Sequence, residues 1–142
     1  MNTKKISTLA KFLNISTQEI QPDEYTTNLY ITPEGEYLVL TDHEATAAAN
    51  DYIASSLWAF NADFILEACG LERSGDIIKS LQAMQNKCCE NCNAFIRALI
   101  DGTCGFDYFC DDAILADGRG HFIDFYDGEE KELDGLYIYR VN

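Results

Sequence analysis

The chain has no lysine or arginine between Lys11 and Arg73, a span of 61 residues that contains eleven carboxylates. Because no cation nearby in sequence can neutralise them, part of the folded protein is expected to present a strong negative field. The formal net charge of the 142 residues is −14. This charge argues against binding nucleic acid through its phosphates and against adhesion to anionic membranes. It favours partners with basic surfaces, although acidity can also serve solubility alone.

The sequence also lacks a long apolar run. No stretch approaches the roughly 18 residues of a membrane helix. The N-terminal region lacks the continuous apolar stretch of about 7–15 residues that a secretory signal needs. The chain is therefore expected to be intracellular, with its six cysteines mostly reduced. It contains only two histidines, and no Ser, His and Asp set stands out as a nucleophilic centre. We therefore expect no catalytic residues and no enzymatic activity.

Length and composition predict one domain over residues 1–142, since domains typically span about 100–150 residues. With 47% apolar residues, the chain has enough material for a core. Residues 1–21 are expected to form short helices, which could be an appendage to that domain. A capping box at Ser16–Glu19 marks the second of these helices.

The pattern of elements predicts an α+β fold. Two strands, 25–31 and 36–40, are expected to form a hairpin around Pro33-Glu34-Gly35. Thr41 and Glu44 form a capping box that should start a helix running to about residue 60. Further helices are expected over 62–69, 74–85, 89–100 and 106–116. Three strands, 121–126, 129–133 and 136–141, should form a C-terminal meander. The helical middle is expected to pack on one antiparallel sheet built from the hairpin and the meander.

Carboxylates are the first candidate binding groups. The sequence predicts an acidic binding surface formed by Glu34, Glu36, Asp42, Glu44, Asp51, Asp63, Glu67, Glu129, Glu130 and Glu132.

Asp117-Gly118-Arg119-Gly120-His121 is a second candidate. Glycines beside Arg119 and His121 could place an anion-binding and a titratable group at a loop tip. The alternative is a tight connection in which glycine relieves strain and Arg119 pairs with nearby carboxylates. We favour that alternative, because catalysis needs several convergent groups.

The cysteines are a third candidate. Cys89 and Cys92 have the spacing of half a zinc site, and four thiolates would be completed by Cys104 and Cys110. The second pair lacks the short spacing of a zinc knuckle, however. Reduced thiols packed between helices are the favoured interpretation, so no cofactor is expected and zinc is an alternative. Trp58, Phe60 and Phe64 are predicted to be core residues rather than a recognition patch.

Several segments together resemble a group of small, acidic, uncharacterised proteins encoded by tailed bacteriophages. They are residues 36–42, 52–61, 117–122, 126–130 and 137–140. This resemblance implies an accessory role in the cytoplasm of an infected bacterial host, and it implies no catalytic residues.

We therefore expect a non-enzymatic protein that binds a basic surface of a host protein, in its sharpest form as a mimic of nucleic acid or an inhibitor of host defence. The alternatives are a structural or assembly component of the virion, a zinc-stabilised interaction domain, and an enzyme with a site at Arg119 and His121.

Overall fold

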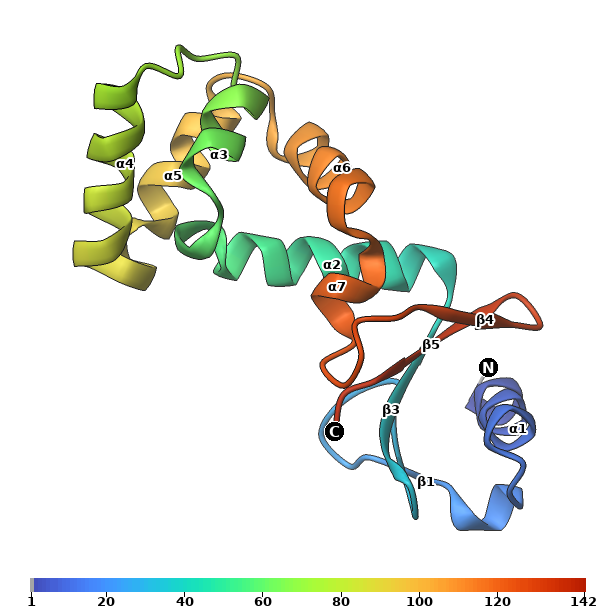
Figure 1. The fold of residues 1–142 in the computed structure, drawn as a ribbon. Helices are drawn as coiled ribbons and strands as arrows, with labels where there is room; N and C mark the ends of the chain where they lie inside the picture. Colours follow the sequence, from blue (N-terminus) through green and yellow to red (C-terminus); the bar gives the residue numbers. More distant parts are fainter. Residues whose placement is uncertain (1) are drawn as a thin grey trace. The chain divides into compact units, whose positions relative to one another are not determined.

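The computed structural model describes residues 2–142, which form two compact units (Figure 1). The first unit contains the residues up to Ala49 together with Gly118–Asn142, and the second contains Asn50–Asp117. Helices and a five-stranded antiparallel sheet are both present, so the predicted α+β class is confirmed. No helix among residues 2–142 has the length and apolar character needed to cross a membrane.

The first unit is built on the sheet, whose strand order is β1-β2-β3-β5-β4. The N-terminal strands are β1 (Gln21–Pro22), β2 (Leu29–Thr32) and β3 (Gly35–Leu40), and the C-terminal pair is β4 (Lys131–Leu133) and β5 (Leu136–Arg140). Every neighbouring pair is antiparallel, and β3 joins the two halves by pairing Val39 with Ile138. The prediction that both ends of the chain share one sheet is therefore confirmed.

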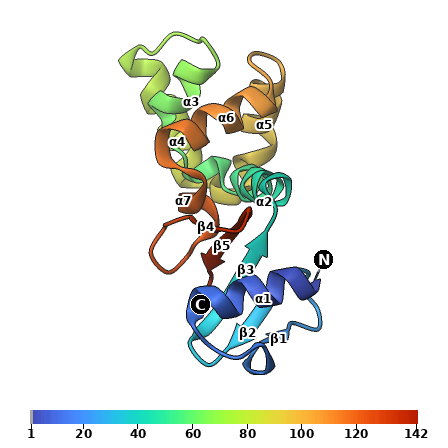
Figure 2. The ribbon, with the colours of Figure 1, turned by 90° about the vertical axis from the view of Figure 1, so that its right-hand side faces the viewer.

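Helix α1 (Asn2–Leu13) covers one face of this sheet (Figure 2). Leu9 is fully buried, and Ala10 nearly so, against core side chains that alternate along the strands: Tyr30, Tyr37, Val39, Leu136 and Ile138. This alternation follows from the two-residue period of a strand. Helix α1 is therefore an integral part of the first unit rather than an appendage. A 3-10 turn, Thr17–Glu19, follows with its predicted capping box at Ser16.

Helix α2 (Asp42–Ser55) begins in the first unit and continues into the second. The second unit also contains α3 (Ala62–Ala68), α4 (Gly75–Cys88), α5 (Asn93–Asp101) and α6 (Phe106–Asp117). Asn61 and Ser74 cap α3 and α4 by accepting hydrogen bonds from backbone amides three residues later. Phe60, Phe64 and Phe109 pack with ring centroids 5.4–6.0 Å apart, which places two of the predicted core aromatics in contact.

Two predicted helices have different bounds. The helix expected to run to residue 60 ends at Ser55. The Ser56 hydroxyl donates to the Tyr52 carbonyl, and the Asn93 side chain donates to the Ser55 carbonyl and accepts from the Trp58 amide. The helix expected from residue 89 begins at Asn93, after a 3-10 turn over Cys89–Cys92. Cys89 has φ of +49°, a backbone conformation that interrupts an α-helix.

The strand predicted over residues 121–126 is wrong, since this segment contains helix α7 (Arg119–Ile123). Gly120 is buried so closely against the chain that an added Cβ would lie 2.7 Å from the Glu130 nitrogen and the Gly128 oxygen. Asp124 ends the helix and accepts backbone hydrogen bonds from Tyr126, Asp127 and Gly128. The C-terminal strands therefore form a hairpin, β4 and β5, instead of a three-strand meander.

Candidate binding surface

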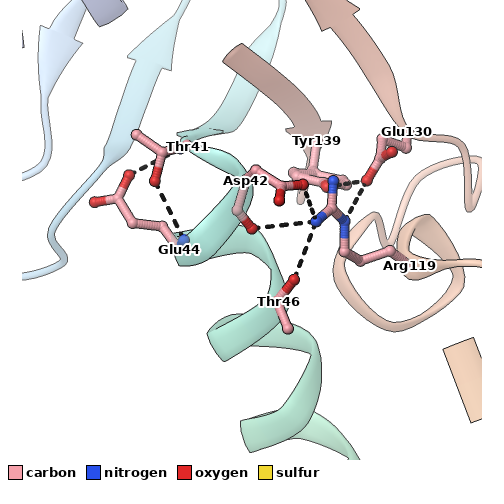
Figure 3. Close-up of polar contacts among 7 residues, drawn as sticks. All are labelled: Thr41, Asp42, Glu44, Thr46, Arg119, Glu130 and Tyr139. Carbon is pink, nitrogen blue, oxygen red and sulfur yellow. Dashed lines mark hydrogen bonds and ion pairs between the residues drawn. The ribbon is translucent and has the colours of Figure 1, made fainter. Parts of the chain in front are cut away.

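Arg119 is at the centre of a polar network in the first unit (Figure 3). Its Nε donates to Glu130 Oε1 at 2.7 Å, and its Nη1 donates to Asp42 Oδ1 at 2.7 Å. The same Nη1 reaches the Asp42 carbonyl at 3.1 Å and the Thr46 hydroxyl at 3.2 Å. Tyr139 also donates to Glu130 Oε1. We call these five residues the Arg119 network.

Arg119 and Tyr139 are largely removed from water, whereas Asp42 stays exposed at the edge of the network. The Arg119 side chain is 12% exposed, and its guanidinium lies 4.6 Å from the centre of the Tyr137 ring. Burial disfavours the charged form of Arg119, but the hydrogen bonds that Arg119 donates to Glu130 and Asp42 outweigh it and raise the pKa of Arg119. Burial, followed by the bond to Glu130, raises the pKa of Tyr139. Arg119 is thus a permanent cation whose Nε and Nη1 donors already have acceptors, which is the arrangement of a structural ion pair.

The predicted loop site at Arg119 and His121 is therefore not an open, convergent site. Arg119 lies on α7 and pairs with carboxylates, as the alternative interpretation predicts. His121 is exposed and packs edge-on against Phe122, with 5.0 Å between ring centroids. It takes no part in the Arg119 network.

A second network holds Glu44, which caps α2 as predicted. The Thr41 amide donates to Glu44 Oε1 at 2.9 Å, and the Glu44 amide donates to the Thr41 hydroxyl at 3.2 Å. Lys5 is 1% exposed and donates to Glu44 Oε1 and to Asn28 Oδ1, each at 2.7 Å. Partial burial by itself would raise the pKa of Glu44, but the bonds from Lys5 and Thr41 outweigh it and lower the pKa to about 2.

Two of the predicted binding carboxylates of the second unit are also paired. Arg73 Nη1 lies 3.3 Å from both Asp63 Oδ2 and Glu67 Oε2, in an exposed bridge. Asp51 is exposed and forms no ion pair with a described residue. Half of the ten carboxylates predicted to bind a partner are thus held by cations of the same chain: Asp42, Glu44, Asp63, Glu67 and Glu130.

The other carboxylates of the first unit are not gathered at one point of the sheet. Glu34 and Glu36 flank Gly35 at the β2–β3 turn. Glu132 lies opposite Tyr137, which lies opposite Leu40 at the other end of β3. Glu36 and Leu40 are four positions apart on β3, which is about 13 Å along the strand. These carboxylates, with Glu129, form no ion pair within residues 2–142, and they spread along the sheet instead of forming one cluster.

The charge is nevertheless large on both units. The first contains 13 carboxylates and 6 lysines and arginines, and the second contains 11 and 4, so each has a formal charge of −7. Eight of the 24 carboxylates form ion pairs within residues 2–142, and the other sixteen form none. The network residues are structural, and so is Asp124, which is buried. The other fifteen carboxylates without an ion pair are at least partly exposed and remain available to a cationic partner.

The four cysteines proposed as zinc ligands are not brought together. Within residues 2–142, no three His, Cys, Asp or Glu side chains converge to hold a metal ion. Cys89 is exposed, whereas Cys110 is fully buried, and burial raises the pKa of the Cys110 thiol to about 12. Cys92 is buried and donates to the Cys89 carbonyl. This agrees with thiols that pack between helices.

Asp124 is the structural carboxylate that the sequence interpretation missed. It is 3% exposed, and besides its three bonds in the following turn it accepts from the Arg140 amide at 2.7 Å through Oδ2. The signal available in sequence was the Asp124-Phe-Tyr-Asp-Gly segment, since aspartate often accepts from the amide two residues later.

In comparisons with known proteins, no family model, curated protein or solved structure matches this chain.

Proposed function

We propose that this protein acts without catalysis by binding a partner protein that has a basic surface. The observation that supports this best is that sixteen of the 24 carboxylates form no ion pair within residues 2–142, and all of these except Asp124 are at least partly exposed. They are distributed over two units of formal charge −7 each. Such a field speeds the encounter with cationic surfaces and repels nucleic acid. In the biological setting implied by the phage resemblance, the partner would be a host protein in the cytoplasm of an infected bacterial cell.

The proposal is broader than mimicry of nucleic acid. A mimic must place its charges at the spacing of phosphates, about 1.7 Å of helix axis per charge in duplex DNA. Glu36 and Glu132 lie far apart along the sheet, and the acidic groups beside Arg119 and Lys5 are neutralised. General electrostatic attraction is therefore better supported than a phosphate-like array.

Pull-down from bacterial lysate tests the proposal. At about 50 mM salt the immobilised protein should retain basic proteins, and at about 500 mM it should release them, because screening shortens the range of the field. A variant with Glu34→Gln, Glu36→Gln, Glu129→Gln and Glu132→Gln should retain less. Four neutralised carboxylates in the second unit (Asp51→Asn, Glu90→Gln, Asp107→Asn, Asp111→Asn) form the control with equal net charge. If the wild-type protein retains no basic protein at either salt concentration, the proposal fails.

The second candidate is a structural or assembly component that associates with itself. Exposed apolar side chains in the helical unit favour it, among them Phe95 at 55% and Leu115 at 84% exposure. A stable oligomer detected by light scattering at both salt concentrations would support assembly over binding to a basic partner.

A further inference from the structure

The second unit has an apolar groove between helices α3, α4 and α5. It encloses about 430 Å³ and is lined chiefly by Leu71, Ile77, Leu81, Met84, Phe95 and Leu99. Three of these side chains are substantially exposed: Leu71 (38%), Ile77 (39%) and Phe95 (55%). Contiguous exposed apolar surface of this kind typically marks an interaction site.

We propose that the apolar groove binds an amphipathic, basic α-helix of a partner protein. This inference rests on the proposed function, because the same partner would supply the basic surface. It adds an apolar point of contact in the helical unit to the long-range attraction that the acidic side chains provide.

The dimensions of the groove suit a helix. Ile77, Leu81 and Met84 are spaced i, i+4 and i+7 on α4, so they extend about 10 Å along its axis. Phe95 and Leu99 have i, i+4 spacing on α5 and form the opposite wall. A helix that inserts apolar side chains at i, i+3 or i+4, and i+7 covers the same length, which is the usual mode of helix-in-groove recognition.

Charge selects the partner. Asp76 lines the groove, and Glu72 follows Leu71 at its edge without an ion pair among residues 2–142. The positive charge of Arg73, the cation beside Glu72, is balanced by Asp63 and Glu67. A second copy of this chain would bring another formal charge of −14 to the same place. Repulsion therefore disfavours a second copy, whereas lysines and arginines flanking an apolar stripe would be attracted.

Titration with defined peptides tests the inference. The probe is a peptide of about 18 residues whose leucines recur at helical spacing and whose other positions are lysine. Its matched controls are a Leu/Glu peptide of the same pattern and a Leu/Lys peptide of scrambled order. The Leu/Lys helix should shift the amide NMR signals of α4 and α5 around the groove, and both control peptides should bind at least about tenfold more weakly.

Variants locate the contact. Phe95→Glu should weaken binding of the Leu/Lys helix at least about tenfold, since it places a charge in the apolar wall. Leu115→Glu, on α6 and outside the groove, should change it less than about twofold. Ile77→Glu is the second groove variant, and circular dichroism confirms that each variant is folded. Because these side chains are largely exposed, the substitutions should leave the fold intact.

In the peptide and oligomer experiments, three results would overturn the inference. They are NMR shifts confined to residues outside the groove, equal binding of the Leu/Glu peptide, and a wild-type dimer that Phe95→Glu dissociates. The last result would identify a second copy as the occupant. If lysate proteins are retained equally by wild-type protein and by Phe95→Glu, the groove is not the contact, yet the proposed basic partner remains supported.

Discussion

Individual carboxylates of this protein have different roles, and their immediate partners decide which. Glu44 and Glu130 are partly exposed, but each lies 2.7 Å from a largely buried cation, Lys5 or Arg119, and serves as a structural anion. The Glu34 carboxylate forms no ion pair within residues 2–142, so its charge contributes to the external field. The acidic residues therefore divide into a stabilising group and a group available to a partner.

Glu44 should make stability depend on pH. Its pKa is lowered to about 2 in the folded protein, from 4.5 without these interactions. Its contribution is therefore fully present above about pH 5 and is lost as the pH falls towards 2. We expect Glu44→Gln to lower the free energy of unfolding at pH 7 by about 1–2 kcal/mol, a value reduced for the partial exposure of the side chain.

Urea unfolding at pH 7 and at pH 2.5 measures this effect. The difference between wild-type protein and Glu44→Gln should shrink at the lower pH. Glu24→Gln, an exposed residue without an ion pair among the described residues, is the control and should change little. An equal difference at both pH values would contradict the assignment.

Among the elements, α7 and its following turn determine how the Arg119 network is assembled. Gly118 has φ of +87°, which lets the chain turn sharply into α7. Gly120 then allows the backbone at 128–130 to approach α7 closely, so Glu130 reaches Arg119. A strand in this place would not provide that approach.

Gly120→Ala should therefore destabilise the protein. The new Cβ would meet backbone atoms at 2.7 Å, which cannot move aside like the end of a side chain. We expect a loss of about 1–3 kcal/mol, the usual cost of overpacking, measured by thermal or urea unfolding. Gly75→Ala is the matched control, because nothing lies within 4 Å of its added Cβ. Equal stability of the two variants would show that the 128–130 segment yields easily.

At the scale of the whole molecule, two units share a similar excess of negative charge but have different surfaces. The first unit combines a sheet with dispersed carboxylates, and the second adds an apolar groove. Attraction over long range and apolar contact at short range are complementary means of binding a basic amphipathic partner.

Metal removal should leave the whole molecule unchanged. Because the cysteines do not converge within residues 2–142, elemental analysis of the purified protein should detect no bound zinc, and a chelator should not lower the unfolding temperature.

In the folded protein, exposed Cys89 should react with a thiol reagent before buried Cys110, and all six thiols should react after unfolding. Stoichiometric zinc, or destabilisation by the chelator, would restore the zinc-stabilised alternative.

Several features could be predicted from local sequence alone. The capping boxes at Thr41 and Ser16, and the caps at Asn61 and Ser74, depend on residues within three positions of each other. The β2–β3 and β4–β5 hairpins follow from alternating apolar residues around turns. The strand predicted over 121–126 is wrong because the aromatic and β-branched residues of this segment are typical of strands, although the segment contains helix α7.

The sequence by itself determined the charge, the α+β class and the local starts of helices, because each depends on composition or on neighbouring residues. Only the tertiary structure decided which carboxylates are neutralised. Asp42 and Arg119 are 77 positions apart, and Lys5 and Glu44 are 39 apart, so no local pattern reveals their contact. The same holds for the apolar groove, whose walls come from separate helices. Long-range packing determines both the ion pairs and the groove, because it decides which side chains are removed from water and which side chains they contact.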